Sequence, residues 1–256
     1  MSALAIKKRI LSFHHQLQSD NNHRYKSWEH CFKYFSQGKL DKDIACLHLA
    51  FYLASWGMYR GSSFLLWKDY LVHREVVQHL LSSQHLRSID FSKQCHAEID
   101  EIFKLSSWIK DWYQQNVSHV NGKAKKIHVT DTLVTKILLG TLGCIPAYDR
   151  YFIEGLRAKG LSHSKLSKTN FLSVVGFYKD NRDDFESIQQ SINRTSGTYY
   201  PTMKLVDMYF WQIGFEKTHK NLKSRSSYPN PSATLRPMRG GVRHVIPNKG
   251  HYEVTK

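Results

Sequence analysis

The residue of this sequence best suited to chemistry is Asp149, in the segment GTLGCIPAYDRYF (residues 140–152). Pro146, three positions earlier, predicts the end of one helix, and Asp149 stands where the next helix would begin. A carboxylate at that place accepts hydrogen bonds from free backbone N–H groups and lies at the positive end of the helix. Such an anion can stabilise a cation that forms during a reaction. The alternative is a carboxylate that only caps the helix.

Aromatic and cationic residues stand close together in two segments of the sequence. Tyrosines flank Asp149, and the segment SWGMYRGSSF (residues 55–64) has a tryptophan, a tyrosine and an arginine beside a glycine turn. Rings and a guanidinium group can stack on a base or fill a gap in opened DNA, although the same residues can also pack in a core. The residues concerned are Trp56, Tyr59, Arg60, Tyr148 and Tyr151.

The net charge of the chain favours a polyanionic partner. Its 256 residues include 37 Lys+Arg against 21 Asp+Glu, which gives a formal charge of +16. A field of this sign most often serves nucleic acid, and RNA, DNA and acidic membranes are all compatible with it. Hydrophobic residues at 41% and aromatic residues at 13% predict that most of the chain folds.

Several function classes lack their sequence patterns. The sequence contains no phosphate-loop motif and no nucleophile-elbow serine, and its 15 histidines form no H-E-x-x-H. We therefore predict no metal and no cofactor. The four cysteines are far apart and are expected to be buried, reduced thiols of a cytoplasmic protein. A signal-peptide pattern and a run of 18 apolar residues are also missing, so no membrane association is expected.

Helical periodicity dominates the sequence, and the predicted fold class is all-α. We expect a helical domain over residues 1–221, built as one unit or as two packed lobes, followed by a basic irregular extension over 222–256. The extension could be solvated or could contact nucleic acid. A helical hairpin is predicted from 41–57 and 62–81. Further helices are predicted over 93–116, 131–140, 149–160, 168–180, 182–194 and 201–215.

The segment DTLVTKILLGTLGCIPAYDRYF (131–152) resembles the catalytic segment of the helix-hairpin-helix DNA glycosylases. In that superfamily a helix leads to small residues, an apolar-proline step and an aspartate that opens the next helix. Residues 140–143, Ile145 with Pro146, and Asp149 take these places here. The resemblance implies a two-lobed helical DNA-glycosylase-like fold. It also implies that Asp149 stabilises the oxocarbenium-like sugar and orients or deprotonates water after a base is flipped into a pocket. The candidates for this pocket or its rim are Trp56, Tyr59, Arg60, Tyr148 and Tyr151.

Two departures from the family's pattern shape the expected DNA contacts and reaction. The hairpin's Gly-x-Gly turn is absent from KKIHVTDT (125–132), which follows a basic loop with an Asn-Gly turn. Bifunctional members have a Schiff-base lysine about 19 residues before the aspartate, but this position is Thr130, and Lys126 and Lys136 do not match it. The resemblance therefore implies a monofunctional enzyme. The residues expected to contact DNA are Lys123, Lys125, Lys126, Thr130, Thr132 and Arg150.

The leading interpretation is a monomeric DNA glycosylase that acts on double-stranded DNA and leaves an abasic site. It would excise a damaged or modified base, in repair or in defence against phage with modified DNA. The first alternative is a non-catalytic, basic nucleic-acid-binding protein whose Asp149 is a cap, and a toxin or nuclease is the third reading. Asp207, one turn after Lys204, is the second carboxylate of interest and is expected to form a structural ion pair or to lie on a helix surface.

Overall fold

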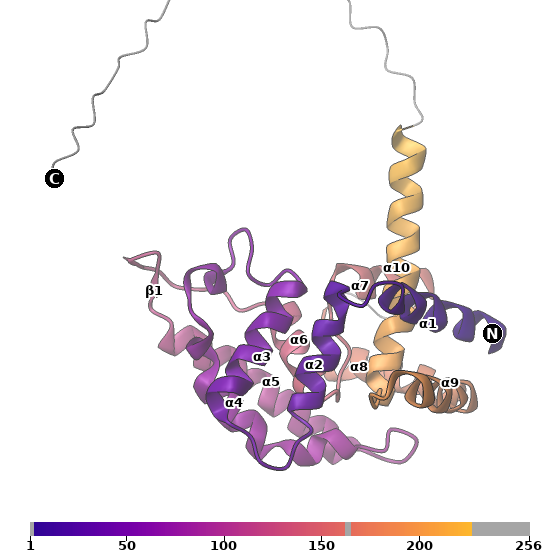
Figure 1. Ribbon diagram of the computed structural model, residues 1–256, viewed down its shortest axis with the longest axis horizontal. Coiled ribbons are helices and arrows are strands. Elements are labelled where there is room, and N and C mark those ends of the chain that lie inside the picture. Colours follow the sequence, from indigo (N-terminus) through magenta and orange to yellow (C-terminus); the bar gives the residue numbers. More distant parts are fainter. Residues whose placement is uncertain (1–2, 162–164, 227–256) are drawn as a thin grey trace, which may run out of the picture.

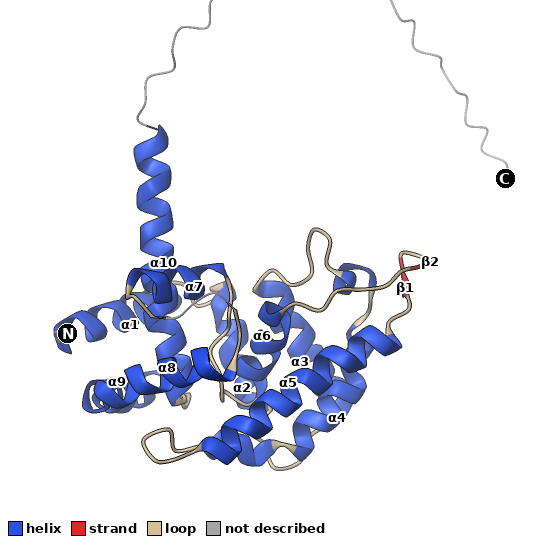
Figure 2. Ribbon diagram, turned by 180° about the vertical axis from the view of Figure 1, so that it is seen from behind, coloured by secondary structure: helices blue, strands red, loops and turns tan. Residues whose placement is uncertain are grey.

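The computed structural model describes residues 3–161 and 165–226, and these residues are predominantly helical (Figures 1 and 2). This helical content confirms the predicted all-α class. The α-helices are α1 (Ala3–Gln18), α2 (Ser27–Tyr34), α3 (Lys42–Ser55), α4 (Arg74–Ser82), α5 (His96–Asn116), α6 (Asp131–Thr141), α7 (Arg150–Ala158), α8 (Lys168–Asp180), α9 (Arg182–Ser196) and α10 (Thr202–Ser226). Four 3₁₀ turns accompany them, η1 (Arg24–Lys26), η2 (Phe64–Trp67), η3 (Tyr70–His73) and η4 (Gln84–Ser88).

The helices form two groups that share one hydrophobic core. Helices α2 to α6 form one group (Figure 1, left). In the other group α10 packs on α1, α7 and α9, and α8 packs on α9 (Figure 1, right). The second group also touches the first where α8 packs on α5. The buried residues form one continuous cluster, which includes the large side chains of Phe13, Trp28 and Tyr52. The segment 142–149 leads from α6 in the first group to α7 in the second, so Asp149 lies where the groups meet.

Helix α7 is held unusually close to α10 because a glycine stands on each side of the crossing. A Cβ atom at Gly155 would lie 2.0 Å from the backbone oxygen of Phe210, and one at Gly214 would lie 1.9 Å from the backbone oxygen of Tyr151. Neither distance is physically possible, so only glycine permits this approach. The position of α7, and with it the position of Asp149, is therefore fixed against α10.

The helix predicted over 62–81 is wrong in its first half. The chain there forms η2 and η3, and α4 begins only at Arg74. The side chain of Ser63 accepts a hydrogen bond at the start of η2, and that of Asp69 does so at the start of η3. Between these turns Lys68 is extended, with φ −127° and ψ 145°. Two successive caps separated by an extended residue therefore interrupt the apolar periodicity that suggested one helix.

The predicted basic loop contains a short antiparallel hairpin, β1 (His119–Val120) and β2 (Lys123–Ala124). Asn121 and Gly122 form its turn with positive φ angles of 52° and 71°. Two consecutive residues of this conformation match the twist of a hairpin, which is why Asn-Gly is favoured there. The Asn-Gly turn is thus confirmed.

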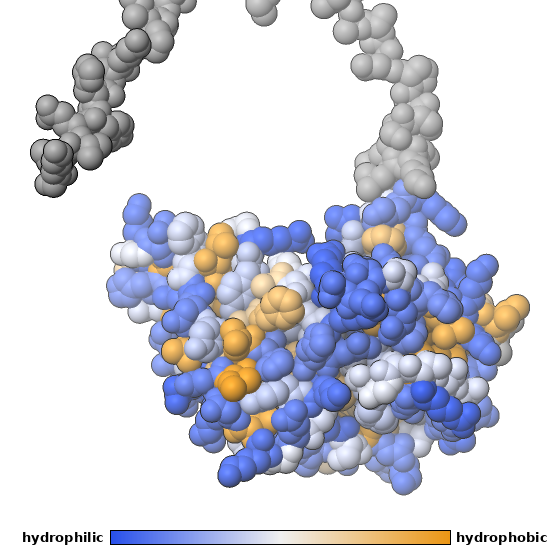
Figure 3. All heavy atoms as spheres, viewed as in Figure 1, coloured by the Kyte–Doolittle hydropathy of each residue, from blue (hydrophilic) through white to orange (hydrophobic). Residues whose placement is uncertain are grey.

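Helix α10 runs to Ser226, past the boundary predicted at residue 221, and the rest of the predicted basic extension, 227–256, lies outside the described residues. All four cysteines are buried and free, as expected. On the face drawn in Figure 3 hydrophilic residues predominate, and hydrophobic ones are exposed in separate places. Leu47 and Phe51 of α3 are two of the exposed hydrophobic residues of the structure. Among the described helices, none has the length and apolar character needed to cross a bilayer.

Candidate functional site

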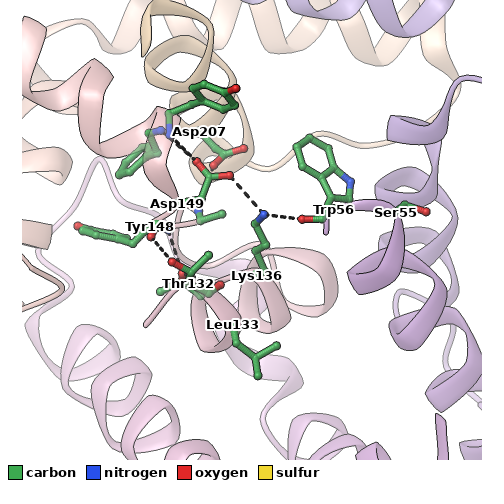
Figure 4. Close-up of polar contacts among 12 residues, drawn as sticks. Ser55, Trp56, Thr132, Leu133, Lys136, Tyr148, Asp149 and Asp207 are labelled. Atoms are coloured by element: carbon green, nitrogen blue, oxygen red, sulfur yellow. Dashed lines mark hydrogen bonds and ion pairs between the residues drawn. The ribbon is translucent and has the colours of Figure 1, made fainter. Parts of the chain in front are cut away.

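Asp149 is the N-cap of α7 (Figure 4). Its Oδ1 accepts hydrogen bonds from the backbone N–H of Tyr151 at 3.0 Å and of Phe152 at 3.1 Å. The residue is extended, with φ −93° and ψ 175°, and its own carbonyl accepts from Ile153 N. The capping geometry expected from the sequence is therefore confirmed.

The second oxygen of Asp149 faces a buried lysine. Oδ2 lies 3.3 Å from the Nζ of Lys136, which comes from α6 and also donates to the carbonyl of Trp56 at 2.9 Å (Figure 4). Lys136 is 4% exposed and Asp149 is 9% exposed. Because both groups are largely withdrawn from water, each is needed to compensate the charge of the other. This pairing distinguishes Asp149 from a simple cap.

The backbone just before Asp149 is fixed by three side chains. Asp207 Oδ1 accepts from the N–H of Ala147 at 3.0 Å. The hydroxyl of Thr135 accepts from the N–H of Tyr148 at 2.9 Å, and the hydroxyl of Thr132 donates to the carbonyl of Tyr148 at 2.8 Å (Figure 4). Two helices, α6 and α10, therefore hold the segment from opposite sides, and the carboxylate stands on a rigid support.

A second buried ion pair lies beneath the first. Lys204 Nζ is 3.1 Å from Asp207 Oδ2, and both residues are 2% exposed. The ammonium also lies within 5.2 Å of the ring centroids of Phe13, Trp28 and Trp56. Burial raises the pKa of Asp207, although the charge of Lys204 acts in the opposite direction. The predicted structural ion pair is confirmed, and the alternative of a surface acid is wrong.

Asp149 and Lys136 line a pocket of about 380 Å³, here called the Asp149 pocket. Its walls are mostly aromatic and cationic. The ring of Trp56 stacks on Tyr25 with centroids 4.4 Å apart, and Trp211 meets both Trp56 and Tyr151 edge to face. The other lining residues are Arg24, Gly57, Met58, Arg60, Thr132 and Arg150. The pocket thus combines stacking surfaces, positive charge and one carboxylate.

A larger pocket of about 640 Å³, the hairpin pocket, adjoins the Asp149 pocket. It lies between the turn at residues 57–64 and the segment that runs from the β-hairpin to α6. Gly57, Met58 and Arg60 line both pockets and form the wall between them. Gly57 has φ +77°, and a Cβ there would meet the Arg60 guanidinium at 2.9 Å, so glycine lets Arg60 lie against the turn.

The structure brings most of the predicted site residues together. Asp149 shares its pocket with Trp56, Arg60, Thr132, Arg150 and Tyr151. Of the other predicted DNA contacts, Lys125, Lys126 and Thr130 line the hairpin pocket, and Lys123 is exposed on β2 outside the lining of both pockets.

Two residues predicted for the base pocket lie elsewhere. Tyr148 is only 1% exposed, and its ring packs on Phe152 with centroids 5.1 Å apart. Tyr59 lines neither pocket, and its hydroxyl lies 2.9 Å from Nε2 of His73. The backbone at residues 147–149 directs the Tyr148 ring into the core while the Asp149 carboxylate faces the pocket, so nearness in sequence did not give nearness in space.

Four further residues of the Asp149 pocket were not predicted from the sequence, namely Arg24, Tyr25, Lys136 and Trp211. Lys136 lies in the apolar run LVTKILL, and a charged residue inside such a run is a sign that it has a buried partner. From the sequence, Lys136 was considered only as a Schiff-base lysine, and its spacing from Asp149 did not fit that role. Tyr25 and Trp211 come from distant parts of the chain and join Trp56 only through packing of α10 and η1.

The chain matches no protein-family model, and searches of curated proteins and of solved structures found no match. Within residues 3–161 and 165–226, no three His, Cys, Asp or Glu side chains are grouped so that they could hold a metal ion.

Proposed function

We propose that this chain is a monofunctional DNA glycosylase that removes a damaged or modified base and leaves an abasic site. One observation carries the proposal. The carboxylate predicted to be essential lines a pocket that has aromatic walls and a cationic rim, on a backbone held by α6 and α10. The two groups of helices would correspond to the two lobes of the superfamily that residues 131–152 resemble.

The Asp149 pocket suits a nucleobase that has left the DNA stack. Enzymes that act on a base flip it out and hold it by stacking and by hydrogen bonds to its edge. Trp56 and Tyr151 supply ring surfaces, and the buried ring of Trp211 supports both of them edge to face. A volume of about 380 Å³ lies in the range of small-molecule sites. The arginines at the rim, Arg24, Arg60 and Arg150, would meet the phosphates beside the flipped nucleotide.

In the proposed reaction the bond between the base and C1′ of the sugar breaks, and its electron pair leaves with the base. Asp149 stabilises the positive charge that develops on the sugar, and it accepts a proton from the water that adds to C1′. The N–H groups of Tyr151 and Phe152 hold Oδ1 in place, so the carboxylate needs little rearrangement during the reaction.

The substrate and setting proposed here follow the same resemblance. The enzyme would act as a cytoplasmic monomer on double-stranded DNA, without metal or cofactor, and the hairpin lysines and the basic extension would hold the DNA backbone. Repair and defence against phage with modified DNA would use the same chemistry, and the identity of the base distinguishes them.

The second candidate is a nucleic-acid-binding protein without catalytic activity. It is favoured by the fact that both oxygens of Asp149 already have partners, two backbone N–H groups and Lys136. DNA binding should weaken as the ionic strength rises for both candidates, because phosphate contacts are driven by the release of counterions. Only the glycosylase would also release a base.

The proposal is tested by incubating the purified chain with DNAs that carry different base modifications and detecting abasic sites. On the substrate that reacts, Asp149→Asn should lower the rate by about 10²- to 10³-fold, the loss typical when a group that stabilises transition-state charge is removed. Asp41→Asn is the matched control, because Asp41 caps α3 in the same way but lines neither pocket. An unchanged rate in Asp149→Asn would reject the assigned role, and salt-sensitive binding without base release on any DNA would favour the second candidate.

A further inference from the structure

The hairpin pocket has the surface of an independent ligand site. Its floor is apolar and comes from buried side chains of Phe64, Val120 and Leu133. Its rim carries exposed cations, Lys125 and Lys126 from the segment after β2, with Arg60 opposite. A pocket of about 640 Å³ with an apolar floor and a few polar groups is typical of a small-molecule site.

The charge of the rim specifies the ligand further. Three cations line the pocket, and no carboxylate of the described residues lines it. The hydroxyls of Ser62, Ser63 and Thr130 stand at the same rim. A ligand that fits must therefore have an apolar, planar part for the floor and an anionic group for the lysines, with polar atoms between them.

We propose that the hairpin pocket binds a nucleotide, with its base on the Phe64 side and its phosphate at Lys125 and Lys126. A base has a π-face that any aromatic side chain can stack on, and the sugar supplies hydroxyl and ether oxygens. The nucleotide would be either free in solution or part of a strand. The site goes beyond the proposed function, since a protein that only binds nucleic acid could use it equally.

The shared wall links this site to the Asp149 pocket. Arg60 lines both pockets, so its guanidinium lies where the phosphate between two neighbouring nucleotides of one strand would pass. If a strand had one nucleotide in each pocket, the phosphate between them would lie at Arg60, the one arginine of the described residues that lines both pockets. This arrangement makes a nucleotide within a strand a better ligand than a free one.

The test measures binding by the full chain of four probes at low salt: deoxyadenosine 5′-monophosphate, deoxyribose 5-phosphate, inorganic phosphate and a single-stranded trinucleotide. Calorimetry should give saturable binding of the mononucleotide, about fivefold or more tighter than deoxyribose 5-phosphate, because only the former has a ring for the floor. The trinucleotide should bind tightest if the site serves a strand. Tighter mononucleotide than trinucleotide binding would assign it to a free nucleotide.

The matched variants separate the pocket from general attraction. Lys125→Ala/Lys126→Ala should weaken mononucleotide binding about tenfold or more, whereas Lys123→Ala, on the same hairpin but outside the lining, should change it less than twofold. Equal losses in both would overturn the proposal, as would equal binding of the mononucleotide and deoxyribose 5-phosphate, or no saturable binding of any probe. Asp41→Asn, at a helix cap that lines neither pocket, should leave mononucleotide binding intact. Binding is measured here without turnover, so a failure of base excision does not bear on this site.

Discussion

Asp41 and Asp149 begin two helices in the same way but in different surroundings. The Oδ1 atom of each accepts two backbone N–H groups, at 2.9 and 3.0 Å for Asp41 and at 3.0 and 3.1 Å for Asp149. Asp41 is exposed, whereas Asp149 is nearly buried, faces Lys136 and lines a pocket. Capping explains how both helices start. It does not explain why Asp149 also pairs with the buried Lys136 and lines a pocket.

The largest effect should come from the ion pair beneath Asp149, which has no counterpart beneath Asp41. Lys204→Met keeps the length of the side chain but leaves the buried Asp207 without a cation, so the free energy of unfolding should fall by about 3–5 kcal/mol. Urea unfolding measures the loss. The deficit should shrink as the pH is lowered, because protonation removes the uncompensated charge, and a deficit that does not change with pH would contradict this origin.

The two caps themselves should differ when each is truncated. Asp41→Ala removes only a cap and should cost about 0.5–2 kcal/mol. Asp149→Ala also leaves Lys136 buried and unpaired, so its cost should be larger, about 2–4 kcal/mol. Adding Lys136→Met should recover part of the second loss in a double-mutant cycle measured by urea unfolding. Equal costs at the two caps would mean that Asp149 is no more than a cap.

The close approach of α7 to α10 should matter for Asp149 and can be tested with two matched glycines. Gly214→Ala places a methyl group against the backbone of Tyr151, which cannot move aside, and should destabilise the protein by about 1–3 kcal/mol. Gly176→Ala, inside α8 with no atom within 4 Å of its Cβ, should instead be neutral or stabilise by up to about 1 kcal/mol. Thermal unfolding compares them, and similar melting temperatures would refute the close crossing.

The last expected effect is an acid-dependent background that must be known before the pH dependence of Lys204→Met is interpreted. Burial lowers the pKa of His73 from 6.5 to about 3, and the hydroxyls of Tyr59 and Tyr113 face its two ring nitrogens. Unfolding therefore takes up a proton between these pH values, so stability falls as the pH drops below 6.5, by at most about 1.4 kcal/mol per unit. His73→Gln should show a shallower dependence in urea titrations from pH 7 to 5, and an equal slope would argue against it.

The parts of the fold that were predictable are those set by local pattern. The apolar periodicity placed most helices, and the acid at Asp41, the Asn-Gly turn and the break before Asp149 each act through their own neighbourhood. The helices α1 and α2 were not assigned, although Ile6, Ile10, Phe13 and Leu17 of α1 form a buried stripe. The start of α4 was missed because side-chain caps at η2 and η3 outweighed periodicity.

The site was predictable only as far as residues near Asp149 in the chain. Arg150 and Tyr151 line its pocket, but the ring of Tyr148 is buried in the core. The chain makes a tight turn at Tyr148, where the N–H of Asp149 donates to the carbonyl of Ala147. The pairing of Lys136 with Asp149 depends on how α6 packs beside the turn at Trp56, and no spacing in the sequence encodes that contact. Tertiary packing thus decides which charges meet.

The common wall at Gly57, Met58 and Arg60 has a thermodynamic consequence for any ligand pair. A molecule that shifts Arg60 when it enters one cavity alters the affinity of the neighbouring cavity, and linkage requires the reverse influence to be of equal size. Ligand binding in one pocket would then change ligand affinity in the other through the Arg60 side chain, and the two ligands would bind with cooperativity or in competition.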